Sequence, residues 1–203
     1  WLPGQNKLAA ISGFGAGGAN AHLLLQSVEL PRRTGPAPES CLILLSAASA
    51  AQLLELAAAL QACLLPQQQH TALSLVDIAH TLWEGRQAYP VRLAIIASDL
   101  LGLQAALTQY LRGDTAGSFW FTGTVEASQQ PTAQSELLAQ SGALSPWTVD
   151  VLQRFAKAWV VGAAPKPTGI YQAWQPRRVS LPGYPFLRER HWLPALPAGS
   201  SLS

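Results

Sequence analysis

The sequence predicts an α/β (α+β) fold in which helices pack on a three-stranded sheet, and three observations support this prediction. Between Cys41 and Gly123, short apolar runs and helical segments follow one another in the order strand, helix, helix, strand, helix, strand. Before them, the glycine-rich stretch Ala10–Leu25 separates two runs with strand character. After them, a short helical segment leads into an extended tail rich in proline and aromatic residues.

The first predicted element is an antiparallel hairpin formed by Lys7–Gly13 and Asn20–Val28. Its loop contains four glycines within six positions, Gly13, Gly15, Gly17 and Gly18. This density of glycine means that the backbone passes where no side chain fits, in left-handed conformations or against a ligand. A two-stranded hairpin is marginally stable alone in water, so we expect other protein to cover its apolar surface.

An alternative interpretation of the glycines is a dinucleotide-binding loop, because Gly13, Gly15 and Gly18 satisfy G-x-G-x-x-G. Such a loop needs a following helix, a second strand and an acidic residue about 20 residues further on. Here the acidic residues Glu29 and Glu39 flank a proline-rich segment that cannot form a buried strand. We therefore favour the hairpin.

The elements of the α/β segment follow from apolar periodicity and from capping residues. Ser49 is predicted to cap the first helix, Ser74 precedes the second, and Asp99 or Ser98 caps the third, which Gly113 ends. The predicted elements are strand Cys41–Leu45, helix Ala50–Leu64, helix Leu75–Trp83 with Gly85 as its stop, strand Val91–Ala97, helix Leu100–Leu111 and strand Ser118–Thr122.

The last third of the chain is predicted to change from helix to extended structure. Ser135–Gly142 has the pattern of a short helix, and Val149–Val161 that of a longer amphipathic helix. Beyond them, Pro176, Pro182 and Pro185 preclude regular helix and remove backbone donors, so the affinity of this tail must come from docked aromatic side chains and arginines. The predicted domains are 1–30 for the hairpin, 31–40 for a proline-rich connector, 41–125 for the α/β segment, 126–175 for the helical part and 176–203 for the tail.

The composition excludes several function classes. The chain is 49% hydrophobic and 12% charged with a formal net charge of +2, which argues against a nucleic-acid partner, and its longest uncharged apolar run is too short for a membrane span. Trp1–Gly4 lacks the features of a secretory signal, so we expect a cytoplasmic protein. Cys41 and Cys63 have apolar neighbours and are expected to be reduced core residues, and the four histidines form no metal-ligand pattern.

The glycine-rich segment Ser12–His22, S-G-F-G-A-G-G-A-N-A-H, resembles the S-F-G-x-G-G-[TS]-N-A-H segment near the C-terminal end of ketosynthase domains in modular polyketide synthases. This resemblance implies a C-terminal hairpin of the thiolase type. Ala16 at the variable position looks like the subclass that uses a free-standing acyltransferase, the trans-acyltransferase class. Gly13 departs from the pattern, because the family usually has Ser or Asn there.

A second segment, Leu75–Ala97, resembles the linker that follows these ketosynthases, with the pattern D-I-A-y-T-L-q-x-G-R-e-x-m-x-x-R-l-A. The match depends on Asp77, Gly85, Arg86 and Arg92. An alternative interpretation is that these charged side chains only satisfy helix ends and loop carbonyls.

A third segment, Arg177–Trp192, resembles R-R-V-x-L-P-x-Y-P-F-x-R-x-x-Y-W, the segment with which such linkers run back over the ketosynthase. His191 stands where Tyr is usual. The resemblance implies that this tail packs on the ketosynthase. The alternative is that the part before Pro185 folds on its own domain.

The resemblance also implies a parent reaction, a decarboxylative Claisen condensation between an acyl chain on the ketosynthase Cys and malonyl on an acyl carrier protein. In this family the nucleophilic Cys and both catalytic His lie upstream of the matching segments, so this chain is expected to be inactive alone. It implies no directly bound cofactor, with phosphopantetheine on the partner carrier protein. The expected partners are the upstream ketosynthase body, the acyl carrier protein and, as a further candidate, a free-standing acyltransferase.

Site residues are assigned by the same resemblance. An oxyanion and acyl-pocket loop is expected at Gly15, Ala16 and Gly17, with Asn20 and His22 as supporting groups. Two functions stay open, a piece of an enzyme site and a spacer or docking module, and a further alternative is a self-contained interaction domain with an unrelated ligand at the glycine-rich loop. The predicted interaction residues are Arg86, Arg92, Leu181, Tyr184, Phe186, Arg188 and Trp192.

Overall fold

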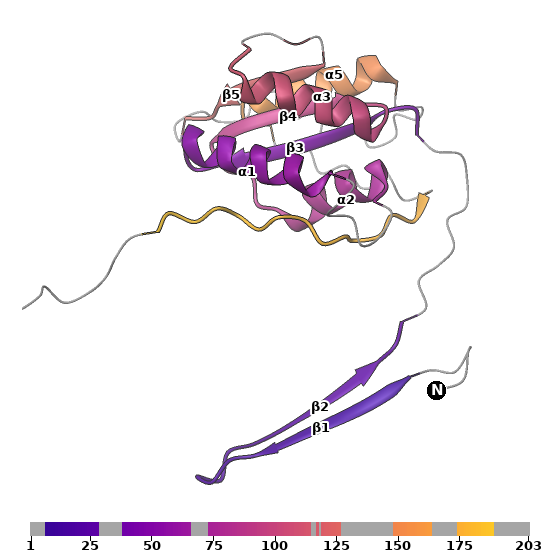
Figure 1. Cartoon of the computed structure of the whole chain (residues 1–203), viewed down its shortest axis with the longest axis vertical. Coiled ribbons are helices and arrows are strands. Elements are labelled where there is room, and N and C mark those ends of the chain that lie inside the picture. Colours follow the sequence, from indigo (N-terminus) through magenta and orange to yellow (C-terminus); the bar gives the residue numbers. More distant parts are fainter. Residues whose placement is uncertain are drawn as a thin grey trace, which may run out of the picture. The chain divides into compact units, whose positions relative to one another are not determined.

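The predicted hairpin and the predicted α/β segment are both present in the computed structural model (Figure 1), in two separate units. Residues 1–34 make the hairpin unit and residues 35–203 make the α/β unit. The structure describes residues 7–28, 38–65, 73–114, 117, 119–126, 148–163 and 174–188. The helix predicted at Ser135–Gly142 and the tail from residue 189 onward lie outside these ranges.

The hairpin unit consists of antiparallel strands β1, Leu8–Phe14, and β2, Asn20–Gln26. Strand β1 runs one residue beyond the predicted end, because Phe14 still pairs with Asn20, and β2 ends two residues before the predicted Val28. Every residue of both strands is exposed to solvent. The described part of this unit therefore has no hydrophobic core of its own.

The α/β unit contains an antiparallel three-stranded sheet in the order β3-β4-β5. Its strands are β3, Cys41–Ala47; β4, Val91–Ala97; and β5, Trp120–Thr124. The predicted bounds of two of these strands are wrong. Strand β3 continues past Leu45, because Ser46 stays in register with Arg92 and its hydroxyl is satisfied by the loop after α2. Strand β5 begins and ends two residues later than predicted, because its pairing with β4 extends to Thr124.

Three helices begin where the sequence predicts: α1, Ala50–Cys63; α2, Leu75–Gly85; and α3, Leu100–Leu111. The side chain of Ser49 accepts a hydrogen bond from the Gln52 amide, and the carboxylate of Asp99 accepts one from the Gly102 amide at 2.6 Å. Asp99, not Ser98, is therefore the cap of α3. Helix α2 is longer than predicted: Gly85 is its last residue and not a stop that follows Trp83, because the backbone becomes extended only at Arg86. None of the helices in the described ranges is long and apolar enough to cross a membrane.

Helices cover both faces of the sheet (Figure 1). Ile43 and Ile95 point into a core with α1, α2 and α3, whereas Leu44 and Ile96 point into a second core with helix α5, Val149–Val160. An antiparallel sheet with one face in water shows alternating polar and apolar residues. Here both faces are covered, which explains why the strands appear in the sequence as continuous apolar runs.

Helix α5 approaches the sheet very closely at its C-terminal end. A Cβ atom on Gly123 of β5 would overlap the carbonyl group of Val160, so only glycine fits at this crossing. Beside it, the guanidinium of Arg92 donates hydrogen bonds from Nη1 to the carbonyl oxygens of Trp159 and Ala163, at 2.6 and 3.1 Å. A cation beside the last carbonyls of a helix also interacts favourably with the helix dipole.

Cys41 and Cys63 are free thiols, as expected. Cys41 is the first residue of β3, and burial raises the pKa of its thiol to about 12. Cys63 is half-buried at the end of α1.

We expect Gly123→Ala to destabilise the α/β unit by about 1–3 kcal/mol, because the added methyl group pushes α5 away from the sheet. The free energy of unfolding in urea measures this effect. Gly183→Ala is the matched control, since a Cβ there meets open space. Equal stabilities of the two variants would contradict the close approach.

We expect a water-soluble disulfide reagent at pH 8 to label Cys63 in the native chain and to label Cys41 only after unfolding.

The thiol pKa of Cys41 is about 12 in the folded state, above its value of about 8.5 in an unfolded chain. The stability due to its neutral thiol is therefore complete below about pH 8.5 and is lost progressively as the pH rises from there toward 12. The urea midpoint of the unaltered chain should fall more steeply between pH 8 and 10.5 than that of Cys41→Ala; parallel curves would refute the shift.

Candidate functional site

The glycine-rich loop closes the hairpin with two backbone hydrogen bonds. The Gly15 amide donates to the carbonyl of Ala19 at 2.8 Å, and the Gly18 amide donates to the carbonyl of Gly15 at 3.0 Å. Two positions require glycine for reasons inside the loop: Gly18 has φ of +86°, and a Cβ on Gly15 would lie 2.8 Å from the Ala19 oxygen. By contrast, a Cβ on Gly13 or Gly17 would meet open space within this unit.

The residues expected to form and support the oxyanion loop lie together at this end of the hairpin. Gly15, Ala16 and Gly17 are exposed at the turn, and Asn20 begins β2 directly after it. His22 lies opposite Ser12 in the strand register, and its Nδ1 is 2.8 Å from the Ser12 hydroxyl oxygen. Sequence reasoning missed Ser12, although a cross-strand register would have identified it.

The Ser12–His22 pair brings a hydroxyl and an imidazole into hydrogen-bond contact. Nucleophilic catalysis by such a pair also needs a group that orients the imidazole. The described residues of the hairpin unit, 7–28, contain no acidic side chain for this task. The pair therefore fixes the geometry of the two strands and does not form a complete catalytic set in the described residues.

Both faces of the hairpin carry exposed apolar side chains. One face presents only aliphatic side chains and glycine, with Ile11 and Leu23 directly opposite each other. The other face is mixed: it carries the Ser12–His22 pair, Asn20 and Gln26 together with Leu24, which is 73% exposed, and Phe14, which is 81% exposed. Strands with apolar residues on both faces are typical of the interior of a covered sheet. Exposed apolar side chains that extend along both strands in this way indicate an interaction site.

The described part of the tail, residues 174–188, lies along the α/β unit beside α1 and α2 (Figure 1). The Arg177 amide donates to the carboxylate of Asp77 at 2.8 Å, and the Val179 amide donates to the hydroxyl of Thr81 at 3.0 Å. Asp77 and Thr81 are one turn apart on α2, and they receive alternate amides of an extended chain.

The following residues of the tail are held by further contacts. Arg86 donates to the carbonyl of Pro182 at 3.1 Å, and Gln52 donates to the carbonyl of Pro185 at 2.8 Å. The Tyr184 hydroxyl accepts a hydrogen bond from the Ala48 amide at 2.8 Å. The segment up to Pro185 thus packs on its own unit, which is the second of the two interpretations of the sequence.

The predicted interaction residues have different environments. Arg92 is only 7% exposed, and it donates to the carbonyls of Trp159, Ala163 and Tyr89 inside the α/β unit. Its buried position also lowers its pKa through desolvation. The sequence alone leaves two roles open for Arg92, because a charged residue inside an apolar run can lie on a docking surface or can satisfy helix ends and loop carbonyls.

Other predicted interaction residues lie on the tail. Leu181 packs partly buried against the core that α1, α2 and α3 share. Phe186 is 75% exposed, and Arg188 is exposed near the end of the described tail. Trp192 lies outside the described residues.

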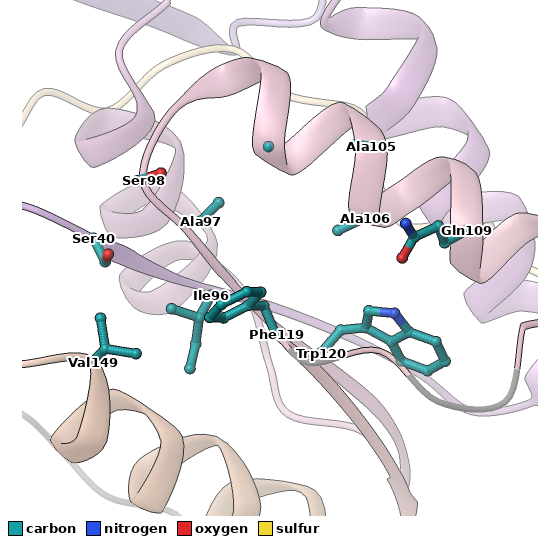
Figure 2. A pocket seen from close by; sticks show the side chains of 11 residues that line it. Ser40, Ile96, Ala97, Ser98, Ala105, Ala106, Gln109, Phe119, Trp120 and Val149 are labelled. Carbon is teal, nitrogen blue, oxygen red and sulfur yellow. The ribbon is translucent and has the colours of Figure 1, made fainter.

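A cavity of about 400 Å³ opens between α3, the sheet and the first residue of α5 (Figure 2). Its lining is apolar or neutral, without a charged side chain, an imidazole or a thiol. Among the described residues there is also no group of three or more His, Cys, Asp or Glu that could hold a metal ion. The lining residues are Ser40, Ile96, Ala97, Ser98, Gly102, Ala105, Ala106, Gln109, Phe119, Trp120 and Val149.

Comparison with known proteins identifies relatives of both units. Residues 41–107 match the family model described as CurL-like, PKS C-terminal. Polyketide synthase PksN of Bacillus subtilis is 33% identical over 194 residues, which cover 92% of this chain and 4% of that protein. This chain therefore spans only a small part of the synthases that it matches.

Solved structures agree with this relationship. The oxazolomycin ketosynthase domain OzmH KS7 of Streptomyces albus is 33% identical with a TM-score of 0.68, covering 94% of this chain and 29% of that one. The ketosynthase from module 6 of the bacillaene synthase of Bacillus subtilis is 29% identical with a TM-score of 0.70, covering 96% and 33%. The chain belongs to the family of ketosynthase C-terminal regions found in polyketide synthases, and its residues 41–107 match the family described as CurL-like, PKS C-terminal.

Proposed function

We propose that this chain is the end of a ketosynthase domain with its flanking linker subdomain, a part of a polyketide synthase module that has no catalytic activity alone. The observation that carries the proposal is the contrast between the two units. Every residue of β1 and β2 is exposed, whereas the α/β unit buries apolar residues on both faces of its sheet. The hairpin therefore needs a larger sheet, and the ketosynthase body that precedes this region in the relatives supplies it.

In this proposal the hairpin contributes the glycine-rich loop to the ketosynthase active site. Ala16 offers its backbone amide to the developing oxyanion, an interaction worth about 3 kcal/mol beside a nucleophile. Ser12 and His22 hold the strands that present the loop. The nucleophilic Cys and the two catalytic His of the decarboxylative Claisen condensation come from the upstream body. The open space beside Gly13 and Gly17 suits the approach of substrate or of that body.

The α/β unit acts in this proposal as a spacer between domains and as a docking surface for a carrier protein or an acyltransferase. The tail continues past its docked part with Phe186 and Leu187, which are 75% and 74% exposed. Apolar side chains at such exposure favour the contact with the ketosynthase that the tail resemblance implies. Arg188 and Trp192 belong to the same proposed contact.

We assign the module to the trans-acyltransferase class. Ala16 at the variable position of the loop supports this assignment, together with the similarity to PksN and to the bacillaene ketosynthase. The substrates would be an acyl thioester on the ketosynthase and a malonyl thioester on the phosphopantetheine arm of the carrier protein.

Amide hydrogen exchange on this chain tests the proposal. We expect Leu8–Gln26 to exchange like an unfolded peptide, because its strands are exposed, while strands β3 and β4 are strongly protected. Leu24→Asp should leave the urea midpoint of the α/β unit unchanged, whereas Leu42→Asp, in the buried strand β3, should unfold it. Equal protection of the hairpin and of β4 in a monomer would show that the hairpin has a sheet of its own here, and the proposal would fail.

Incubation with an acyl thioester is expected to leave this chain unmodified. Cys41 is buried with a raised thiol pKa, and the Ser12–His22 pair lacks an orienting acid in the described hairpin. Intact-protein mass spectrometry measures the result, with a complete ketosynthase as the positive control. Specific acylation of Cys41 or Cys63 would contradict the proposed lack of catalysis.

A further inference from the structure

We propose that the loop of residues 86–90, here called the coupling loop, links the docking of helix α5 to the docking of the C-terminal tail. The loop connects α2 to β4; it contacts the tail directly and is joined to the end of α5 through Arg92 of β4. These two elements lie against opposite sides of the sheet. Val179 and Leu181 of the tail pack on the core shared by α1, α2 and α3, whereas Phe155 and Trp159 of α5 form the other core.

The link to α5 runs through Arg92. One guanidinium donates from Nε to the carbonyl of Tyr89 at 3.0 Å and from Nη1 to the carbonyls of Trp159 and Ala163. Its carbon also lies 4.9 Å from the centroid of the Trp159 ring. Because the guanidinium is planar and rigid, a shift of the Tyr89 carbonyl and a shift of the α5 end act on the same group.

The link to the tail uses both ends of the coupling loop. The ring of Tyr89 stacks on the ring of Tyr184, with centroids 4.7 Å apart, and Tyr184 in turn meets the edge of Phe186 at 5.0 Å. At the other end, Arg86 donates to the carbonyl of Pro182. The tail therefore holds the loop at two points.

Hydrogen bonds from Ser46 of β3 also hold the loop in position. The Ser46 hydroxyl accepts from the Tyr89 amide at 2.9 Å and donates to the carbonyl of Gln87 at 3.2 Å. A cavity of about 110 Å³ lies between this loop, Leu56, Leu82 and the Tyr184 ring. With this space beside it, the loop is held by these polar contacts, by the Tyr89–Tyr184 stacking and by the hydrogen bond from the Val125 amide to the Pro90 carbonyl at 2.9 Å.

Two elements that hold one loop in one position must influence each other reciprocally. A partner that draws the tail away through the exposed Phe186 and Leu187 would loosen α5, and a partner that displaces α5 would loosen the tail by the same factor. The coupling rests on contacts inside the α/β unit and does not depend on the proposed function.

The first experiment is Ser46→Ala in the full chain, followed by peptide-resolved hydrogen exchange. Ser46 has no hydrogen bond to the tail or to α5 among those described, yet we expect exchange in both 148–163 and 174–188 to rise by about fivefold, the effect of one net hydrogen bond, with Val91–Ala97 little changed. Thr108→Val on α3 removes a hydroxyl with two hydrogen bonds away from the loop and is the matched control. A response confined to one of the two segments, or an equal response to Thr108→Val, would overturn the proposal.

The second experiment tests reciprocity with Arg92→Met, Tyr184→Leu and the double variant. Arg92→Met should accelerate exchange of the Arg177 and Val179 amides, and Tyr184→Leu should accelerate exchange in α5 by a similar factor. The double variant should show less than the product of the two single effects. Effects that stay local or that multiply would show that the two docking events are independent. If Arg92→Met does not fold, the Ser46→Ala result alone decides.

Discussion

Burial of strand β4 on both faces is the constraint on which the rest of the α/β unit depends. Leu93 and Ile95 must be covered by the helices of one side, and Ala94 and Ile96 by α5 on the other. The charged residue in this strand, Arg92, then needs acceptors that water cannot supply, because a buried unpaired charge is strongly destabilising. The carbonyls at the end of α5 and of Tyr89 meet that need, so the buried charge determines where the helix and the loop lie.

The hairpin strands also carry many apolar residues, but no helix among the described residues of that unit covers them. Its strands carry apolar residues on both faces, but all residues of these strands are exposed in the described structure, including Leu24 and Phe14. Full burial of one such side chain contributes about 1.5–3 kcal/mol, so covering several of them would strongly favour association with a larger sheet. A hairpin with exposed apolar residues on both faces is suited to an interface, and in the proposed function the ketosynthase body covers it.

Local signals explain which parts of the fold were predictable. Val91–Ala97 and Leu100–Leu111 have their predicted bounds, because an apolar run and the carboxylate of Asp99 are visible in the sequence. The sequence leaves two interpretations of the tail for a physical reason: the backbone amides of Arg177 and Val179 make the hydrogen bonds to α2, and a backbone amide leaves no residue pattern. The placement of α5 was equally invisible, since an amphipathic helix shows that it packs but not on which face.

The match to the CurL-like family ends at residue 107, but the structural unit does not. Helix α5 completes the second core, and Trp120 of β5 enters the first, where Leu181 and Tyr184 of the tail also pack. A fragment that stopped with the family match would leave the α5 side of the sheet open, with Leu44 and Ile96 exposed to water. The described residues between 108 and Tyr184 are therefore part of the folded unit, and the step from docked to exposed tail, at Pro185 and Phe186, marks where contact with another domain can begin.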